Sequence, residues 1–129
     1  MTERAFPLII SPQVSATAEF YEQLGFIRQV QNPPTGEPSF VGLRRDATEI
    51  AIVDTAWPKD QYGDSVGTGA RYEMFVFVDE VDTILDKLRH EGVPVLREPV
   101  TMPWGERVAH VADPDGNAVA LASVVRRVT

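Results

Sequence analysis

The chain has 129 residues, of which 43% are hydrophobic and 24% are charged. This composition is typical of a soluble globular protein, and the length suits one compact domain or two very small ones. A formal net charge of -7 argues against binding to nucleic acid or to an anionic membrane, since both require a basic surface. The absence of Cys excludes disulfides, thiolate metal sites and Cys nucleophiles.

The first ten residues, MTERAFPLII, lack the basic start, the long apolar core and the cleavage site of a signal peptide. No apolar run in the sequence is long enough to span a bilayer. We therefore expect a cytoplasmic protein.

The first half of the chain predicts one helix among four strands. Ser11 and Pro12 are typical of a helix start, and apolar residues then recur at helical spacing until Gly25, which is typical of a helix end. Strands are predicted by short apolar or alternating runs over residues 6–10, 26–31, 40–44 and 49–53, the last two forming a hairpin.

The second half predicts the same order of elements. After a strand over residues 71–78, Asp79 is a candidate N-cap, with Asp82 placed as in a capping box, and Gly92 ends the helix. Further strands are predicted over residues 93–96, 108–112 and 118–124, with a hairpin turn at the sequence DPDG, residues 113–116.

This repetition is the most informative feature of the sequence. Gly25 and Gly92 are both helix ends, and the strand IAIV at 50–53 corresponds to VALA at 119–122. We predict an α+β fold of two tandem βαβββ modules, residues 4–55 and 71–125, joined by a loop over residues 56–70. The helices are expected to cover the outer face of a cupped mixed sheet.

The opposite, inner face of each predicted sheet is unusually apolar. Along the last strand, Ala118 and Ala120 alternate with Val119 and Leu121. A strand face that carries only methyl groups either packs against something close or is left open for a guest molecule. The residues assigned to the inner face by strand alternation include Phe6, Leu8, Ile10, Ala51, Val53, Arg71, Glu73, Phe75, Phe77, Ala118 and Ala120, and we expect two such faces to enclose a cavity.

Three segments carry a resemblance to a known family: FYEQLGF at 20–26, FVDEVDTILDKLRHEGV at 77–93 and PWGERVAHVADPDGNAVAL at 103–121. They resemble the vicinal oxygen chelate superfamily, which includes glyoxalase I, extradiol dioxygenases and the fosfomycin- and bleomycin-resistance proteins. The resemblance implies paired βαβββ modules and, for a chain of this size, a homodimer.

The same resemblance implies where a divalent metal would bind. The ligand positions of the family's metal enzymes fall on Phe6, Ala51, Glu73 and Ala120, and of these only Glu73 has a side chain that can donate to a metal. We therefore expect no metal and no other cofactor.

Two polar residues are candidates for chemistry on the predicted inner face. Glu73 is interpreted either as a base or hydrogen-bond acceptor for a ligand, or as an ion-paired residue without a role, with Arg71 as a possible partner. His110 is interpreted either as a general base or ligand donor, or as an ordinary residue of a half-exposed strand.

Trp57 and Trp104 are each adjacent to Pro and are predicted to lie on loops. They are candidates for aromatic walls that stack on a planar ligand, or for packing at a module or dimer seam. The segment 54–70 is long enough to be a lid or a simple linker.

Three functions compete at this point. The first is a metal-free protein that binds an apolar or aromatic small molecule, of the sequestration or resistance type. The second is a lyase, isomerase or dioxygenase that uses Glu73 and His110, with or without a metal, and the third is a dimeric module without a small-molecule role. The predicted ligand-binding residues are Phe6, Leu8, Ala51, Trp57, Glu73, Phe75, Trp104, Arg107, His110 and Ala120.

Overall fold

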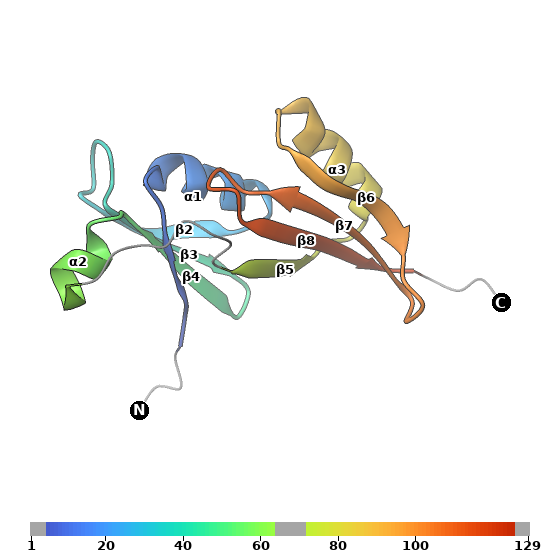
Figure 1. The fold of residues 1–129 in the computed structure, drawn as a ribbon, viewed down its shortest axis with the longest axis horizontal. Coiled ribbons are helices and arrows are strands. Elements are labelled where there is room, and N and C mark those ends of the chain that lie inside the picture. The colour runs from blue at the N-terminus through green and yellow to red at the C-terminus, as the bar shows by residue number, and fades with distance from the viewer. Residues whose placement is uncertain (1–4, 64–71, 126–129) are drawn as a thin grey trace. The chain divides into compact units, whose positions relative to one another are not determined.

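The structure is a computed structural model that describes residues 5–63 and 72–125. The chain divides into two compact units, residues 1–68 and 69–129. Each unit contains a four-stranded mixed sheet with a helix along one face (Figure 1). The predicted α+β fold of two tandem βαβββ modules is confirmed.

In unit 1, β1 is parallel to β4 and the other neighbouring strands are antiparallel, in the order β1-β4-β3-β2. Helix α1 contacts β2, β3 and β4. The elements are β1 Leu8–Ile10, α1 Val14–Gln23, β2 Ile27–Asn32, β3 Phe40–Arg45, β4 Thr48–Val53 and a second, short helix α2 Trp57–Tyr62.

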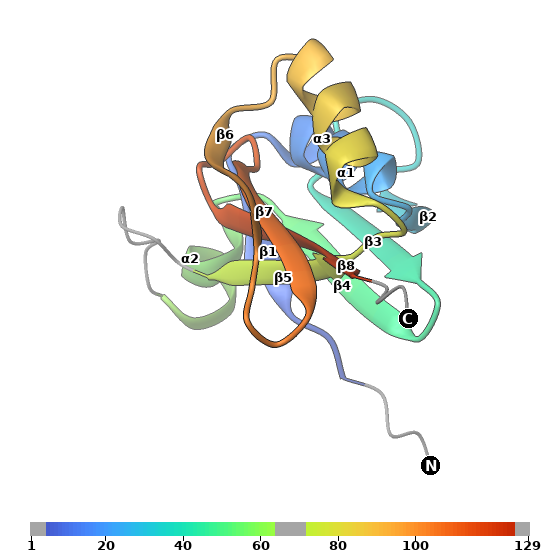
Figure 2. The same cartoon turned by 90° about the vertical axis from the view of Figure 1, so that its right-hand side faces the viewer.

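Unit 2 repeats this topology with the strand order β5-β8-β7-β6, and β5 is parallel to β8. Helix α3 contacts β6, β7 and β8 and is the yellow to orange helix in Figure 2. The elements are β5 Glu73–Phe77, α3 Val81–His90, β6 Val95–Thr101, β7 Glu106–Ala112 and β8 Ala118–Val124.

The two sheets also share their register. Leu8 pairs with Ala51 on β4, and Phe75 pairs with Ala120 on β8. On the other side of these alanines lie Gly42 and His110, respectively. The repeat in the sequence is therefore a repeat in the pairing of individual residues, so positions in one unit can be compared directly with positions in the other.

The hydrophobic core of each unit lies between its sheet and its helix. Alternate residues of each strand point to this side because side chains alternate across a sheet. Burying each large aliphatic side chain stabilises the fold by about 1.5–3 kcal/mol. The buried residues include Ile9, Val14, Ala18, Tyr21, Val41, Leu43, Ile50 and Ile52 in unit 1, and Val76, Val81, Leu85, Leu88, Ala109, Val111, Val119 and Leu121 in unit 2.

The turn DPDG is held by a network around one buried carboxylate. Asp113 is 3% exposed, and its Oδ1 atom accepts hydrogen bonds from the backbone N–H groups of Asp115 and Asn117, both at 2.9 Å. Its Oδ2 atom accepts from the Nδ2 group of Asn117 at 3.1 Å and from the hydroxyl of Tyr72 at 3.2 Å. Gly116 takes a φ of 83°, which only glycine adopts freely. The motif is therefore structural in this chain.

Two predicted helix starts were wrong by a small shift. The N-cap of α3 is Glu80, not Asp79, and no side chain of the helix caps its first turn. Instead the N–H of Val81 donates to Ser123 Oγ on β8 at 3.3 Å, so the neighbouring strand satisfies this group. Asp82 forms no capping box. Pro12 likewise precedes α1, which begins at Val14.

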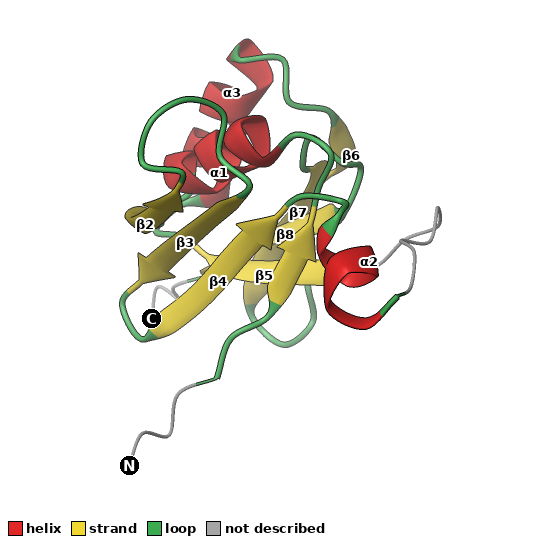
Figure 3. Cartoon of the chain, turned by 90° about the vertical axis from the view of Figure 1, so that its left-hand side faces the viewer, coloured by secondary structure: helices red, strands yellow, loops and turns green. Residues whose placement is uncertain are grey.

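The segment predicted as a loop over residues 56–70 contains α2, which follows β4 in Figure 3. Pro58 lies in its first turn, where proline is tolerated, and Gly63 ends it with a φ of 75°. Residues 64–70 of the segment, and Arg71, lie outside the described residues. No helix in the described part of the chain is long and apolar enough to cross a membrane.

Strand ends also differ from the prediction. The first strand begins at Leu8, so Phe6 precedes it, and the third strand of the second half, β7, begins at Glu106 instead of residue 108. Strand β6 starts two residues late but extends to Thr101, because its partner β7 continues to Glu106. β8 occupies residues 118–124, as predicted.

Candidate functional site: the inner sheet faces

Each sheet has an inner face, defined here as the face opposite its main helix. In unit 1 this face contains a hollow of about 310 Å³, which we call the inner hollow. Strands β2, β3 and β4 and Phe6, two residues before β1, surround it. It is lined by Phe6, Gln29, Val30, Phe40, Gly42, Leu43, Glu49, Ile50 and Ala51.

The inner hollow exists because two paired residues at its floor have little or no side chain. Gly42 on β3 pairs with Ala51 on β4. A Cβ atom placed on Gly42 would lie 3.7 Å from the Phe40 ring and 3.8 Å from Val30, which are ordinary contact distances. The absence of a side chain at Gly42 is therefore not required by crowding, and it leaves space above the strand.

The inner hollow also contains polar groups that sequence reasoning missed. Glu49 lies two residues before Ala51 on β4, and its side chain is only 15% exposed. The Arg44 guanidinium lies 3.1 Å from its carboxylate. The alternation that placed Ala51 on the inner face also places Glu49 there, and this signal was available in the sequence.

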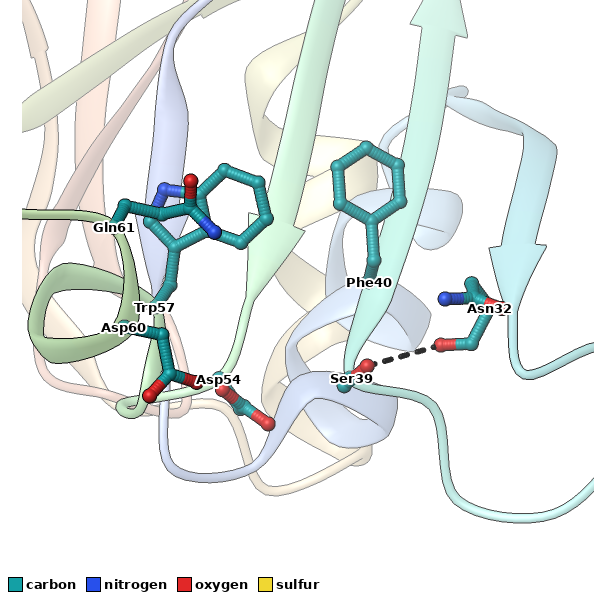
Figure 4. Close-up of a pocket in the computed structure, with 7 residues that line it drawn as sticks. All are labelled: Asn32, Ser39, Phe40, Asp54, Trp57, Asp60 and Gln61. Carbon is teal, nitrogen blue, oxygen red and sulfur yellow. Dashed lines mark hydrogen bonds between the residues drawn. The ribbon is translucent and has the colours of Figure 1, made fainter.

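A second hollow in unit 1, of about 270 Å³, shares Phe40 with the inner hollow and has a more polar lining. We call it the polar hollow (Figure 4). Phe40 and Trp57 contribute aromatic rings whose centroids are 6.2 Å apart at an interplanar angle of 39°. Trp57 lies on α2 and not on a loop as predicted, and it lines this hollow. The lining residues are Asn32, Ser39, Phe40, Asp54, Trp57, Asp60 and Gln61.

In unit 2 the structure brings the two candidate catalytic residues together. The Nε2 atom of His110 lies 3.8 Å from the Oε2 atom of Glu73. Their backbone partners on the strand between them are Ala120 and Ala118, respectively. The Nδ1 atom of His110 is buried and has no hydrogen-bond partner among the described residues. The pair is a candidate for hydrogen bonding to a ligand or for acid–base chemistry.

The other two inner-face alanines of β8, Ala120 and Ala122, are buried. Ala120 and Ala122 have no exposed surface and form a cluster with Val108, against which Met102 packs. Phe75 is 49% exposed. Its ring centroid lies 5.7 Å from that of Phe77. A guest on this face would therefore meet aromatic rings, and it would not meet the predicted ligand-binding residue Ala120.

Arg107 lies apart from Glu73 and His110. It points to the helix side of β7, where its Nε and Nη2 groups donate to Asp82 of α3 at 2.7 and 3.1 Å. These hydrogen bonds lower the pKa of Asp82 from its ordinary value and raise that of Arg107. The odd-numbered residues of β7 face the helix, so strand alternation already separates Arg107 from His110.

Trp104 is 64% exposed in the turn between β6 and β7. Its indole N–H donates to Glu106 at 2.9 Å. Leu8, another predicted ligand-binding residue, lies on the inner face of unit 1 beside Ala51 and is 37% exposed. Neither residue lines the inner hollow or the polar hollow.

The donor groups do not fit a metal centre of the kind that the resemblance implies. A metal ion needs several nitrogen, oxygen or sulfur ligands from side chains that converge. Within the described ranges, no group of three or more His, Cys, Asp or Glu is placed to hold one. The implied positions Phe6, Ala51 and Ala120 carry no donor atom on their side chains.

Comparison with protein families shows a match over residues 5–121 to the glyoxalase/bleomycin resistance protein/dioxygenase superfamily. A probable lactoylglutathione lyase from Synechocystis sp. (strain ATCC 27184 / PCC 6803 / Kazusa) is 34% identical over 93 residues, which cover 68% of each chain.

Solved structures share the fold at lower sequence identity. TioX from Micromonospora sp. ML1 matches with a TM-score of 0.76 and 17% identity, over 96% of this chain and 100% of TioX. A bleomycin resistance determinant encoded on the transposon Tn5 matches with a TM-score of 0.64 and 19% identity, over 95% and 98% of the two chains. These likenesses show the fold alone.

Proposed function

Because the chain belongs to the glyoxalase/bleomycin resistance protein/dioxygenase superfamily, we propose that it binds an apolar or aromatic small molecule without a metal and releases it unchanged. The inner hollow of unit 1 is the binding site that the geometry supports best. Its walls are mostly apolar, with Gln29 and Glu49 as the polar groups that would orient a guest. Ligand sites commonly combine apolar walls with a few such groups.

The observation that carries this proposal is the pairing of Gly42 with Ala51. A glycine in the interior of a strand costs about 0.5–1 kcal/mol relative to alanine. At this position neither a positive φ nor a close neighbour requires it. A guest that approaches the strand closely explains a glycine that the fold itself does not need.

The hollow is a suitable size for the aromatic core of a small molecule, not for a whole drug-sized one. Its volume of about 310 Å³ lies at the lower end of the range for ligand pockets. Burying a two-ring aromatic guest there would stabilise the complex by roughly 25 cal/mol per Å² of apolar area buried.

The family resemblance suggests that a second inner face completes the site. We therefore also propose a homodimer, to be checked by light scattering.

A graded series at Gly42 tests the site. The probe is 2-naphthol, a neutral planar molecule, titrated into ¹⁵N-labelled protein. We expect saturable shifts of the backbone amides of Gly42, Val30 and Ala51. The Gly42→Ala variant should weaken binding modestly and Gly42→Leu should abolish it. The matched control is Ala47→Leu, which adds comparable bulk at an exposed position of the β3–β4 turn in the same unit.

Two outcomes contradict the proposal. Unchanged affinity in Gly42→Leu, with the control intact, places the guest elsewhere. Shifts confined to residues of unit 2, such as Phe75, move the site to the other sheet.

The alternative is an enzyme, and the Glu73–His110 pair favours it. The Synechocystis relative is named a probable lactoylglutathione lyase, so formation and breakdown of lactoylglutathione are the reactions to assay, with and without added Zn²⁺ or Ni²⁺. The binding proposal expects no turnover. Turnover that Glu73→Gln abolishes, while the variant keeps its thermal midpoint, would establish the enzyme instead.

A further inference from the structure

The polar hollow of unit 1 combines two aromatic rings that contact each other with two carboxylates. Trp57 and Phe40 provide aromatic surface, and Asp54 and Asp60 provide two carboxylates. In Figure 4 the two carboxylates lie below the rings of these aromatic residues. An apolar guest alone would not explain the carboxylates, and an ordinary solvated acidic surface would not explain the rings.

The two carboxylates are not neutralised within the described part of the chain. No Lys, Arg or His there forms an ion pair with Asp54 or Asp60. Asp54 uses its Oδ1 atom to accept a hydrogen bond from the backbone N–H of Ala56 at 3.1 Å. Its Oδ2 atom and the carboxylate of Asp60 have no hydrogen bond to a described residue, so both can accept from a ligand.

The remaining lining groups are neutral and polar. Ser39 donates its hydroxyl hydrogen to the backbone carbonyl of Asn32 at 3.3 Å, so it is already engaged. Asn32 and Gln61 add amide groups at the rim. No cationic side chain lines the hollow, so an anionic ligand would meet only repulsion from the two carboxylates.

We propose that the polar hollow binds an organic ammonium cation, with the aromatic rings against its carbon substituents and the carboxylates of Asp54 and Asp60 beside its charge. Cations bound over indole and phenyl rings gain from the ring quadrupole, and a carboxylate adds a direct Coulomb attraction. A bare divalent metal is a poorer match, since Ca²⁺ takes six to eight oxygen ligands and two of the seven lining residues are aromatic.

The size of the hollow limits the ligand. About 270 Å³ accommodates a small alkyl- or arylammonium ion, or the cationic group of a larger molecule. Phe40 lines both hollows. This inference does not depend on the proposed function, because the other residues of the ammonium site do not line the inner hollow and the site has its own probe.

Trp57 provides the reporter for a direct test. The chain has two tryptophans, and Trp104 is in the other unit. In a Trp104→Phe background, tryptophan fluorescence therefore reports Trp57 alone. The probe is benzyltrimethylammonium chloride, and the neutral comparison is benzyl alcohol. We expect saturable quenching by the cation and at least tenfold weaker binding of the alcohol.

Charge-removing variants then test the carboxylates. Asp54→Asn keeps the oxygen that accepts from Ala56, and Asp60→Asn is similarly close in shape. Each should weaken benzyltrimethylammonium binding by roughly threefold to tenfold, and the effect should shrink at about 1 M salt, where charges are screened. The matched control is Asp46→Asn, which removes one charge at the opposite end of the β3–β4 hairpin. Its affinity should be unchanged.

The same titration can be followed in ¹⁵N-labelled protein without the Trp104→Phe change, by the shift of the Trp57 indole N–H resonance. The Trp57→Phe variant assigns this resonance. Equal binding of the cation and the alcohol overturns the proposal. So does an Asp46→Asn effect as large as that of Asp54→Asn, because general charge would then explain the binding. If 2-naphthol does not bind and benzyltrimethylammonium does, the proposed function is refuted and the ammonium site still stands.

Discussion

Glu73 and His110 meet across a strand that belongs to neither of them. The Nε2 atom of His110 on β7 lies 3.8 Å from the Oε2 atom of Glu73 on β5, and β8 lies between these two strands. The residues of β8 that pair with them are Ala118 and Ala120. Only small side chains on the intervening strand allow two longer ones to approach above it, so the methyl groups of β8 are a condition for this contact.

This relationship predicts the effect of enlarging Ala118. The Ala118→Val variant should separate Glu73 from His110, because two additional methyl groups would occupy the space between them. In wild-type background, a double-mutant cycle with Glu73→Gln and His110→Gln should give a coupling free energy of up to about 1 kcal/mol, as expected for a partly exposed pair. In the Ala118→Val background the coupling should vanish. Coupling that survives this change would show that the alanine is not what allows the contact.

The Gly42→Ala variant should stabilise unit 1. Alanine in a strand avoids the entropic cost of glycine, and the added Cβ meets Phe40 and Val30 at ordinary contact distances. We expect a gain in the free energy of unfolding of about 0.5–1 kcal/mol, measured by urea denaturation.

The matched comparison is Gly36→Ala. Nothing lies within 4 Å of a Cβ placed there, but the backbone φ is 82°. This variant should lose roughly 1–2 kcal/mol from backbone strain alone. Destabilisation by Gly42→Ala of the same size would mean that the strand around Gly42 does not tolerate a side chain.

The Asp113→Ala variant should be among the most destabilising single changes in unit 2. It removes one buried carboxylate and leaves its donors on Tyr72, Asp115 and Asn117 without their acceptor. We expect a loss of roughly 2–4 kcal/mol in the free energy of unfolding.

Asp113→Asn separates the two halves of this network. It keeps an oxygen for the backbone N–H groups but presents an NH₂ group to the side chains of Tyr72 and Asn117. Its loss should therefore be intermediate. Equal losses for the two variants would locate the whole effect in the side-chain contacts.

The Arg107–Asp82 pair predicts a pH dependence. Hydrogen bonds from Arg107 hold the pKa of Asp82 below its ordinary value of 3.8 in the folded state. A lowered folded-state pKa means that the pair contributes its full stabilisation above the ordinary pKa and loses it as the pH falls through the lower, folded value. The difference in unfolding free energy between wild type and Asp82→Asn should thus be constant between about pH 7 and pH 5 and should disappear in stronger acid. A difference that persists unchanged at about pH 2 would show that the charge of Asp82 is not its cause.

The sequence by itself determined the two βαβββ units, their α+β class and the side of each strand on which a residue lies. These features depend on local physics: the period of the apolar pattern, glycines with positive φ after the helices, and the hydrogen bonds of the DPDG turn. Strand alternation was sufficient to place Ala51 and Glu73 on inner faces. It also contained the information that Arg107 and His110 point in opposite directions.

Only the tertiary structure decided which alanine on an inner sheet face lines a hollow. Ala120 has no exposed surface and lies in a cluster with Ala122 and Val108, on which Met102 from the chain between β6 and β7 packs. At the equivalent position in unit 1, Ala51 is also buried, at 1% exposed, but it lines the inner hollow next to Gly42. The pairing of Trp57 with Phe40 was equally invisible in the sequence, since α2 interrupts a segment expected to be a loop. The residues that pack on the face of a strand come from other segments of the chain, so the local sequence pattern of that strand does not predict them.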